Sequence, residues 1–296
     1  MSALRRPPQL RRSWLFIPGA ERLRLDQATG LAADVLMQEL EDFCPPERRP
    51  EARAMAPAVL ARWRDAGKVA AVRINPLESG GMDDLDAVMP GRPDAVLMAM
   101  VCTPDQVRRL DTLIGDHERR HGIPPGSTEI VPNVETAAGL VQTGAIVSAS
   151  PRVTAALVAA EDMAADLGAE RTADCRELSY ARQRFLVECV AAGVTAIDCP
   201  YTFRSLEGAE SDLIWARGLG YKAKSLVHAD QIDLIHRILS PSDDDRARAE
   251  AMVAAFEAAR ARGEDRVLVD GLMVEVPTYK AAQRLIARHS ALNGAI

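Results

Sequence analysis

The chain has 296 residues, of which 48% are hydrophobic and 26% are charged, and its formal net charge at pH 7 is −6. This length suits either two domains or one (β/α) barrel with an appendage, and the composition excludes a disordered chain. The excess of acidic residues disfavours a dedicated nucleic-acid-binding protein, because such proteins are normally basic.

The cysteine pattern and the hydropathy indicate the cellular compartment. The five cysteines include no CxxC pair, and their odd number excludes a complete disulfide framework, so we expect buried thiols in a reducing cytoplasm. No apolar run approaches the roughly 20 residues that a membrane-spanning helix needs. The charged residues 1–14 are not followed by the apolar stretch of a secretory signal. We therefore predict a cytoplasmic protein with no membrane or nucleic-acid partner.

Short apolar runs recur along the chain, each close to strand length and rich in Val, Ile or Leu. They are residues 14–17, 35–40, 69–74, 95–100, 130–134, 154–160, 195–198 and 223–227. Amphipathic segments separate them, and residues 46–66, 103–121 and 174–192 are the clearest helices, each ending near a glycine. Eight strand–helix repeats predict a (β/α)8 TIM barrel. A doubly wound open sheet is the alternative, but no GxGxxG motif follows the first strand.

The alternation stops after residue 240. Ser242 and the aspartates that follow it are typical of a helix start, which predicts a helix to residue 262. The sequence VLVDGLMVEV predicts a hairpin that turns at Asp270–Gly271, and a last helix is expected over residues 278–290. We therefore predict a catalytic barrel domain over residues 1–240 and a C-terminal helix–hairpin–helix lid over 241–296.

Polar residues gather where the apolar runs end, and the carboxyl ends of barrel strands surround the active site. The acidic ones are Glu39, Glu41, Asp42, Glu135, Glu161, Asp162, Asp166 and Asp198. Acids around one mouth repel each other unless a cation lies among them. Oxygen ligands suit Mg²⁺, or else Mn²⁺, better than zinc. Glu135 and Asp162 are our candidate ligands.

Some of these positions also have a structural interpretation. Glu41 and Asp42 precede Pro-Pro-Glu and fit a helix start equally well. Asp166 is expected to be solvated, and His228 fits a structural histidine as well as a catalytic one. Arg73, at the end of the third run, is expected to be functional because a buried guanidinium needs an anion. The other histidines lie in helical segments and are expected at the surface.

Eight motifs follow one another along nearly the whole chain. They are RSWLFIPG (12–19), ADVLMQELEDFCPPE (33–47), VRINP (72–76), VPNVETAAG (131–139), AEDMAADLG (160–168), AIDCPYT (196–202), VHADQI (227–232) and LVDGLMVEVP (268–277). In this order they resemble the citrate lyase β-subunit (CitE)-like proteins of the HpcH/HpaI aldolase superfamily, which are relatives of the malyl-CoA and citramalyl-CoA lyases.

The resemblance implies a TIM barrel, Mg²⁺ and reversible carbon–carbon cleavage of a short 3-hydroxyacyl-CoA, such as malyl-CoA or citramalyl-CoA, to acetyl-CoA and a 2-oxoacid. By this resemblance, Glu135 and Asp162 match the metal ligands. Arg73 matches the arginine that holds the thioester or enolate oxygen, and Glu41 and Asp42 match an acidic pair near the metal-bound waters.

The resemblance also implies further binding groups and an assembly. Glu275 matches an aspartate that a neighbouring subunit brings over the site, so it is the candidate base, and a homotrimer or homohexamer is expected. The candidates for contacts with CoA are Arg12, Phe16, Pro18 and Arg22.

The chain departs from the family pattern at several positions. Glu39 stands in place of an aspartate, Met100 and Cys102 in place of a lysine and a glutamate, and Asn133 in place of an apolar residue. Glu275 is one methylene longer than the family's aspartate, which extends its reach by about 1.5 Å. A misplacement of about 1 Å can cost on the order of 100-fold in rate.

These departures leave three alternative functions open. The first is hydrolysis of an acyl-CoA thioester by the same fold. The second is an aldolase reaction on a free 2-oxo acid without CoA. The third is a catalytically diverged subunit or binding protein, against which the intact Arg73, Glu135 and Asp162 argue.

Overall fold

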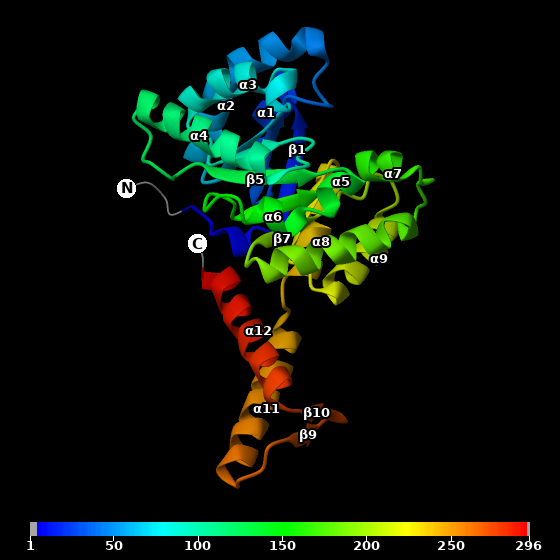
Figure 1. Ribbon diagram of the computed structural model, residues 1–296. Helices are drawn as coiled ribbons and strands as arrows, with labels where there is room; N and C mark the ends of the chain where they lie inside the picture. Colours follow the sequence, from blue (N-terminus) through cyan, green and yellow to red (C-terminus); the bar gives the residue numbers. More distant parts are fainter. Residues whose placement is uncertain (1–4, 295–296) are drawn as a thin grey trace. The chain divides into compact units, whose positions relative to one another are not determined.

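The computed structural model describes residues 5–294 and contains a closed barrel of eight parallel strands in sequential order (Figure 1). The strands are β1 Ser13–Pro18, β2 Val35–Glu39, β3 Val69–Ile74, β4 Ala95–Met98, β5 Glu129–Val134, β6 Ala155–Val158, β7 Thr195–Asp198 and β8 Ala223–Leu226. Each strand pairs with the next, and β8 closes on β1. The predicted (β/α)8 TIM barrel is confirmed.

Alternate residues of each strand point into the barrel and form its core. This inner cluster consists of Trp14, Phe16, Val35, Met37, Val69, Ala71, Ala95, Leu97, Val131, Ala155, Leu157, Ile197 and Ala223. The remaining strand residues face the surrounding helices and are buried as well, which explains the continuous apolar runs. Continuing the alternation past Met37 and Ala71 brings Glu39 and Arg73 to the inner face at the carboxyl end of the barrel.

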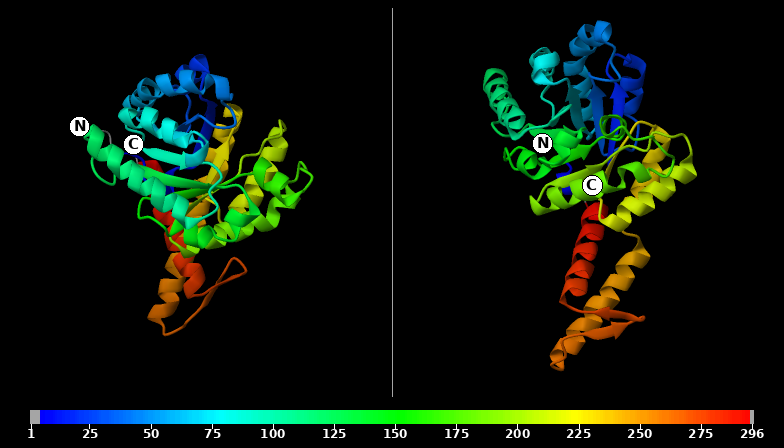
Figure 2. Two further views of the ribbon diagram at one scale, coloured as in Figure 1. Left: turned by 45° about the horizontal axis from the view of Figure 1, so that its top comes forward. Right: turned by 45° about the vertical axis from the view of Figure 1, so that its right-hand side comes forward.

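Helices connect the strands and lie outside the barrel (Figures 1 and 2). They are α1 Arg22–Ala28, α2 Arg49–Asp65, α3 Gly81–Val88, α4 Pro104–His121, α5 Ala137–Leu140, α6 Thr143–Val147, α7 Glu161–Leu167, α8 Ser179–Ala191, α9 Leu206–Leu219 and α10 Ile232–Leu239. The predicted helix start at Thr103 carries a capping box with Gln106, and α4 ends at Gly122 in the left-handed conformation. Within residues 5–294, no helix is long and apolar enough to cross a membrane.

The chain divides between His236 and Arg237 into two compact units. The second unit contains α11 Asp243–Ala261, β9 Val267–Val269, β10 Leu272–Val274 and α12 Val276–Gly294. Helices α11 and α12 pack along each other, and β9 and β10 pair antiparallel (Figure 2). Both residues of the predicted turn, Asp270 and Gly271, have positive φ, as a two-residue hairpin loop with a type I′ turn requires.

Gly19 explains the end of the RSWLFIPG motif. A Cβ atom at this position would lie 2.1 Å from the carbonyl oxygen of Glu39. Only glycine therefore lets the loop after β1 approach the end of β2 so closely. The buried side chain of Gln38 donates to the carbonyl of Gly19 at 2.9 Å. These contacts hold the first two loops together at the carboxyl end of the barrel.

Two histidines expected at the surface are buried instead. His117 and His289 are only 5% and 6% exposed. The Nε2 atom of His117 lies 3.3 Å from Asp86, and that of His289 lies 3.0 Å from Asp243. Each ring therefore packs on its helix with an aspartate as polar partner, which the sequence spacing did not indicate.

Candidate active site

Arg73 is the centre of the polar cluster inside the carboxyl end of the barrel. Its Cα pairs in register with that of Glu39, and its Nε donates to Glu39 Oε1 at 2.8 Å. Its other nitrogens donate to Glu41, to Asp42 at 2.9 Å and to Glu135 at 3.3 Å. Arg73 is buried, with an exposed fraction of 5% for the whole residue. The buried Arg73 therefore binds four carboxylates: one at the end of β2, two in the loop after β2 and one directly after β5.

The carboxylates raise the pKa of Arg73. Burial alone would lower that pKa, but the negative charges of Glu39, Glu135 and Glu41 outweigh burial. The ring of Phe16 also lies 5.3 Å from the Cζ atom of Arg73, which adds a cation–π contact. The guanidinium is therefore charged and fixed in place, as the sequence-based expectation of an anionic partner requires.

Glu39 orders the loop that carries Glu41 and Asp42. Its carboxylate, at the end of β2, is fully buried and accepts the backbone N–H groups of Glu41, at 2.7 Å, and of Phe43. The loop therefore turns around the Glu39 side chain and directs both acids toward Arg73. Glu41 and Asp42 do not start the following helix, because α2 begins later, at Arg49.

Glu135 follows β5 and is almost completely buried. Its Oε2 accepts the backbone N–H of Met100 at 2.7 Å, and Met100 has a φ of 55°. Burial raises the pKa of Glu135 to about 7, with Arg73 and the Met100 N–H opposing and the negative charge of Asp162 adding to the rise. Thr136, not Glu135, caps the next helix, because its side chain accepts from the N–H of Gly139.

Asp162 stands in the first turn of α7 and faces the same cavity as Arg73. This cavity has a volume of about 290 Å³. Its walls include Phe16, Asp42, Phe43, Arg73, Leu157, Ala159, Glu161, Asp162, Thr202 and Val227. Burial raises the pKa of Asp162, and the charge of Asp42 adds to the rise. Asp166, one turn further on, is exposed and accepts the N–H of Ala137.

The cluster has more negative than positive charge. Besides the four carboxylates on Arg73, Asp162 acts on the same site, and burial raises the pKa of Glu41 to about 8 although Arg73 opposes this rise. Such a cluster either takes up protons or binds a cation. No group of three or more His, Cys, Asp or Glu among residues 5–294 is arranged to hold a metal. A hard ion that keeps several waters, such as Mg²⁺, fits two carboxylates.

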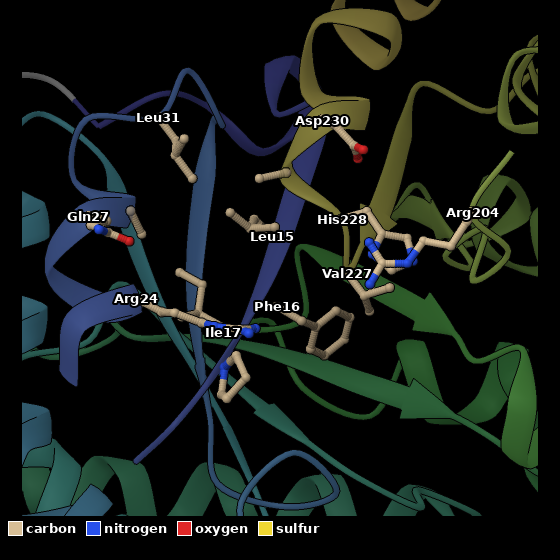
Figure 3. A pocket seen from close by; sticks show the side chains of 13 residues that line it. Leu15, Phe16, Ile17, Arg24, Gln27, Leu31, Arg204, Val227, His228 and Asp230 are labelled. Atoms are coloured by element: carbon tan, nitrogen blue, oxygen red, sulfur yellow. The ribbon is translucent and has the colours of Figure 1, made fainter. Parts of the chain in front are cut away.

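A second cavity has a volume of about 430 Å³ (Figure 3). Phe16 and Val227 line both cavities. In Figure 3, β1 and the segment after β8 form its walls, with Arg24 and Arg204 as its cationic groups and His228 at its side. His228 Nε2 lies 3.1 Å from the carbonyl oxygen of Thr202, a partner that fits the structural interpretation. The other lining residues come from α1 and from the loops after α1 and β7.

The structure separates the four residues expected to contact CoA. Phe16 and Pro18 line the second cavity, whereas Arg22 is exposed on α1 outside its lining. Arg12 precedes β1, and six strand residues separate it from the carboxyl end, a distance of about 20 Å at roughly 3.3 Å per residue. At the amino end of β1, Arg12 forms an ion pair with Asp34 at 3.1 Å. Arg12 is therefore not part of this site.

The chain is similar in sequence to known proteins. Residues 12–229 match the HpcH/HpaI aldolase/citrate lyase family. The citrate lyase subunit beta of Escherichia coli strain K12 is 33% identical over 297 residues, covering 99% of this chain and 97% of that protein. A (3S)-malyl-CoA thioesterase of Cereibacter sphaeroides strain ATCC 17029 is 29% identical and covers 95% of each chain.

Solved structures show the same fold. The CitE protein of Mycobacterium tuberculosis, crystallised with magnesium, acetoacetate and coenzyme A, superimposes with a TM-score of 0.76 at 26% identity and covers 94% of this chain and 98% of that one. The match to the family extends over most of the barrel, and the relatives extend over nearly the whole chain. The chain therefore belongs to the HpcH/HpaI aldolase/citrate lyase family, as an enzyme similar to the citrate lyase β subunit.

Proposed function

We propose that this enzyme is a Mg²⁺-dependent carbon–carbon lyase. It would cleave a short 3-hydroxyacyl-CoA, such as malyl-CoA or citramalyl-CoA, to acetyl-CoA and a 2-oxoacid, or catalyse the reverse condensation. The observation that carries the proposal is the cluster of four carboxylates on the buried Arg73, with Asp162 on the same cavity. The similarity to a CitE protein crystallised with magnesium, acetoacetate and coenzyme A supports it.

Glu135 and Asp162 would hold the ion. Each is a hard oxygen donor, and the charge of Asp162 raises the pKa of Glu135, as expected for neighbouring carboxylates. When bound, Mg²⁺, or Mn²⁺ in its place, supplies Lewis acidity to the substrate hydroxyl and carboxylate oxygens that become the 2-oxoacid. Glu41 and Asp42, fixed through Glu39 and Arg73, would accept hydrogen bonds from water at the site.

Arg73 would stabilise the thioester enolate that forms when the carbon–carbon bond breaks. A guanidinium has five N–H groups, and four hydrogen bonds from Arg73 to carboxylates leave one N–H on Nη1. A charge-assisted bond from that group to the enolate oxygen is stronger in the transition state than in the substrate, so it lowers the barrier.

The second cavity would hold the CoA part of the substrate. Its apolar wall of Leu15, Phe16 and Ile17 suits the pantetheine chain, while Arg24 and Arg204 suit the phosphates. Phe16 lines both cavities. A CoA thioester bound in the second cavity would therefore extend past the Phe16 ring toward Arg73. Arg24 and Arg204 would then take the role that the sequence resemblance gave to Arg12 and Arg22 as candidates.

Glu275 is our candidate for the base that removes the hydroxyl proton. It is exposed and directly precedes α12 in the C-terminal unit. The family pattern implies that a neighbouring copy supplies this carboxylate, in a homotrimer or homohexamer. Glu275→Gln would then lower turnover without changing the affinity for Mg²⁺.

The test is an analysis of products. The enzyme is incubated with malyl-CoA or citramalyl-CoA, with Mg²⁺ or with EDTA. The proposal requires acetyl-CoA together with glyoxylate or pyruvate, and only when Mg²⁺ is present. Absence of turnover with every short 3-hydroxyacyl-CoA would contradict a lyase.

Hydrolysis of the thioester is the second candidate, because a (3S)-malyl-CoA thioesterase relative also covers 95% of the chain. A thioesterase releases free CoA together with malate and forms no 2-oxoacid. The same incubation therefore separates the two reactions. A thiol reagent detects free CoA, and a phenylhydrazine assay detects glyoxylate.

A further inference from the structure

Asn133 lies inside the barrel next to Glu135, at a position where the family pattern has an apolar residue. It is fully buried in β5. It follows the inward-facing Val131 on the same face and pairs in register with Leu157, which lines the cavity of Arg73. The amide is therefore enclosed by the barrel, beside Glu135.

The two polar atoms of this amide differ in their contacts. Nδ2 lies 3.4 Å from Glu135 Oε1. The reverse orientation would bring two oxygens to that distance, so the nitrogen faces the carboxylate. Oδ1 is buried and has no hydrogen-bond partner among the residues that the structure describes. An unpartnered buried acceptor is costly unless a donor comes from outside the chain.

The donors around Glu135 leave one lone pair of its carboxylate unused. Oε1 faces both the Nη1 of Arg73, at 3.3 Å, and the amide of Asn133. Among residues 5–294, Oε2 accepts only the N–H of Met100, at 2.7 Å. Because each carboxylate oxygen has two lone pairs, Oε1 is filled and Oε2 keeps one lone pair.

We propose that Asn133 is a positioning residue of the cation site: its amide nitrogen donates to Glu135 Oε1, which would leave Oε2 to bind the ion, and its amide oxygen would accept a hydrogen bond from a water on the ion. Mg²⁺ and Mn²⁺ keep several waters, and each bound water needs acceptors. An amide supplies the donor and the acceptor together, which no apolar side chain does. The inference rests on the proposed cation site at Glu135 and Asp162.

The experiment measures Mn²⁺ binding without substrate, from the electron paramagnetic resonance signal of the free ion. Asn133→Leu has a similar volume and the apolar character of the family, and it should raise the Kd for Mn²⁺ on the order of tenfold. If the leucine variant does not fold, Asn133→Val, which suits a strand, carries the same expectation. An unchanged Kd in a folded variant would overturn the inference.

Gln38→Leu is the matched control. Gln38 is also a buried strand amide whose oxygen has no hydrogen-bond partner within residues 5–294. Its nitrogen, however, donates to the carbonyls of Gly19 and Ala52, away from Glu135. Its replacement should lower the unfolding temperature and leave the Mn²⁺ affinity unchanged. An equal loss of affinity in both variants would show that Asn133 acts through stability alone. If the wild-type enzyme itself binds no Mn²⁺, that result contradicts the proposed function as well as this inference.

Discussion

Glu39 and Arg73 lie opposite each other in register on β2 and β3, and a 2.8 Å ion pair joins their side chains inside the barrel. The same carboxylate accepts the N–H groups of Glu41 and Phe43. Glu39 therefore orients the guanidinium and the acidic loop at once, and it couples the stability of this end of the barrel to the geometry of the site.

Glu39→Gln should lower the free energy of unfolding by about 2 kcal/mol, because a buried charged hydrogen bond is lost and Arg73 keeps its charge. Urea denaturation measures the change. Glu51→Gln is the control, since its ion pair with Arg48 is about half exposed and should contribute less than about 0.5 kcal/mol. Equal changes in the two variants would contradict the role of Glu39.

Arg73→Lys should reduce kcat by about 100-fold or more while leaving the KM for the acyl-CoA within a few-fold. Lysine keeps a charge but loses the planar fork that holds several carboxylates and the substrate together. The measurement is steady-state cleavage of malyl-CoA. Arg109→Lys, at an exposed ion pair on α4, should be unchanged. A fall in kcat that is equal in the two variants would remove the assignment.

Binding of Mn²⁺ to the free enzyme should weaken below about pH 7. Burial raises the pKa of Glu135 to about 7, so below that pH the carboxyl holds a proton that the ion must displace. Above it the carboxylate is free and affinity should level off. We expect about a tenfold rise in Kd for each pH unit below 7. A Kd that is constant between pH 5.5 and 7 would contradict Glu135 as a ligand.

Arg24→Glu should raise the Kd for CoA by about tenfold, and the effect should shrink at high salt, because a cation near the phosphates is replaced by an anion. Isothermal titration with free CoA measures it. Arg22→Glu changes the charge equally on the same helix but lies outside the cavity lining. It should have little effect, and a larger effect at Arg22 than at Arg24 would reverse our assignment.

The strand–helix alternation sufficed to predict the barrel, because eight apolar runs with glycine stops leave few other architectures. The inner face of each strand could not be predicted. Parallel barrel strands are buried on both sides, so the sequence does not show which of Gln38 and Glu39 faces the inside of the barrel. In the structure, Gln38 contacts α2 and Glu39 contacts Arg73. The acids at the strand ends were recognisable because their positions follow from the fold.

Arg24 and Arg204, the cationic groups of the second cavity, were not among the candidates taken from the sequence. Arg24 and Arg204 are long side chains on a helix and a loop, and such residues resemble any solubilising arginine in a sequence. The sequence resemblance grouped Arg12 with Phe16 and Pro18, because one motif contains all three and spans the whole of β1. Residues at the two ends of one strand lie at opposite ends of a barrel, so proximity in sequence was misleading.

The most direct test of the proposed cation site is anomalous diffraction from crystals soaked in Mn²⁺. We predict one strong peak within about 2.3 Å of an oxygen of both Glu135 and Asp162, lost in Asp162→Asn and kept in Asp166→Asn, whose side chain lies one turn away and still accepts from Ala137. A peak bound elsewhere, or no peak between these two carboxylates, would contradict the proposed site.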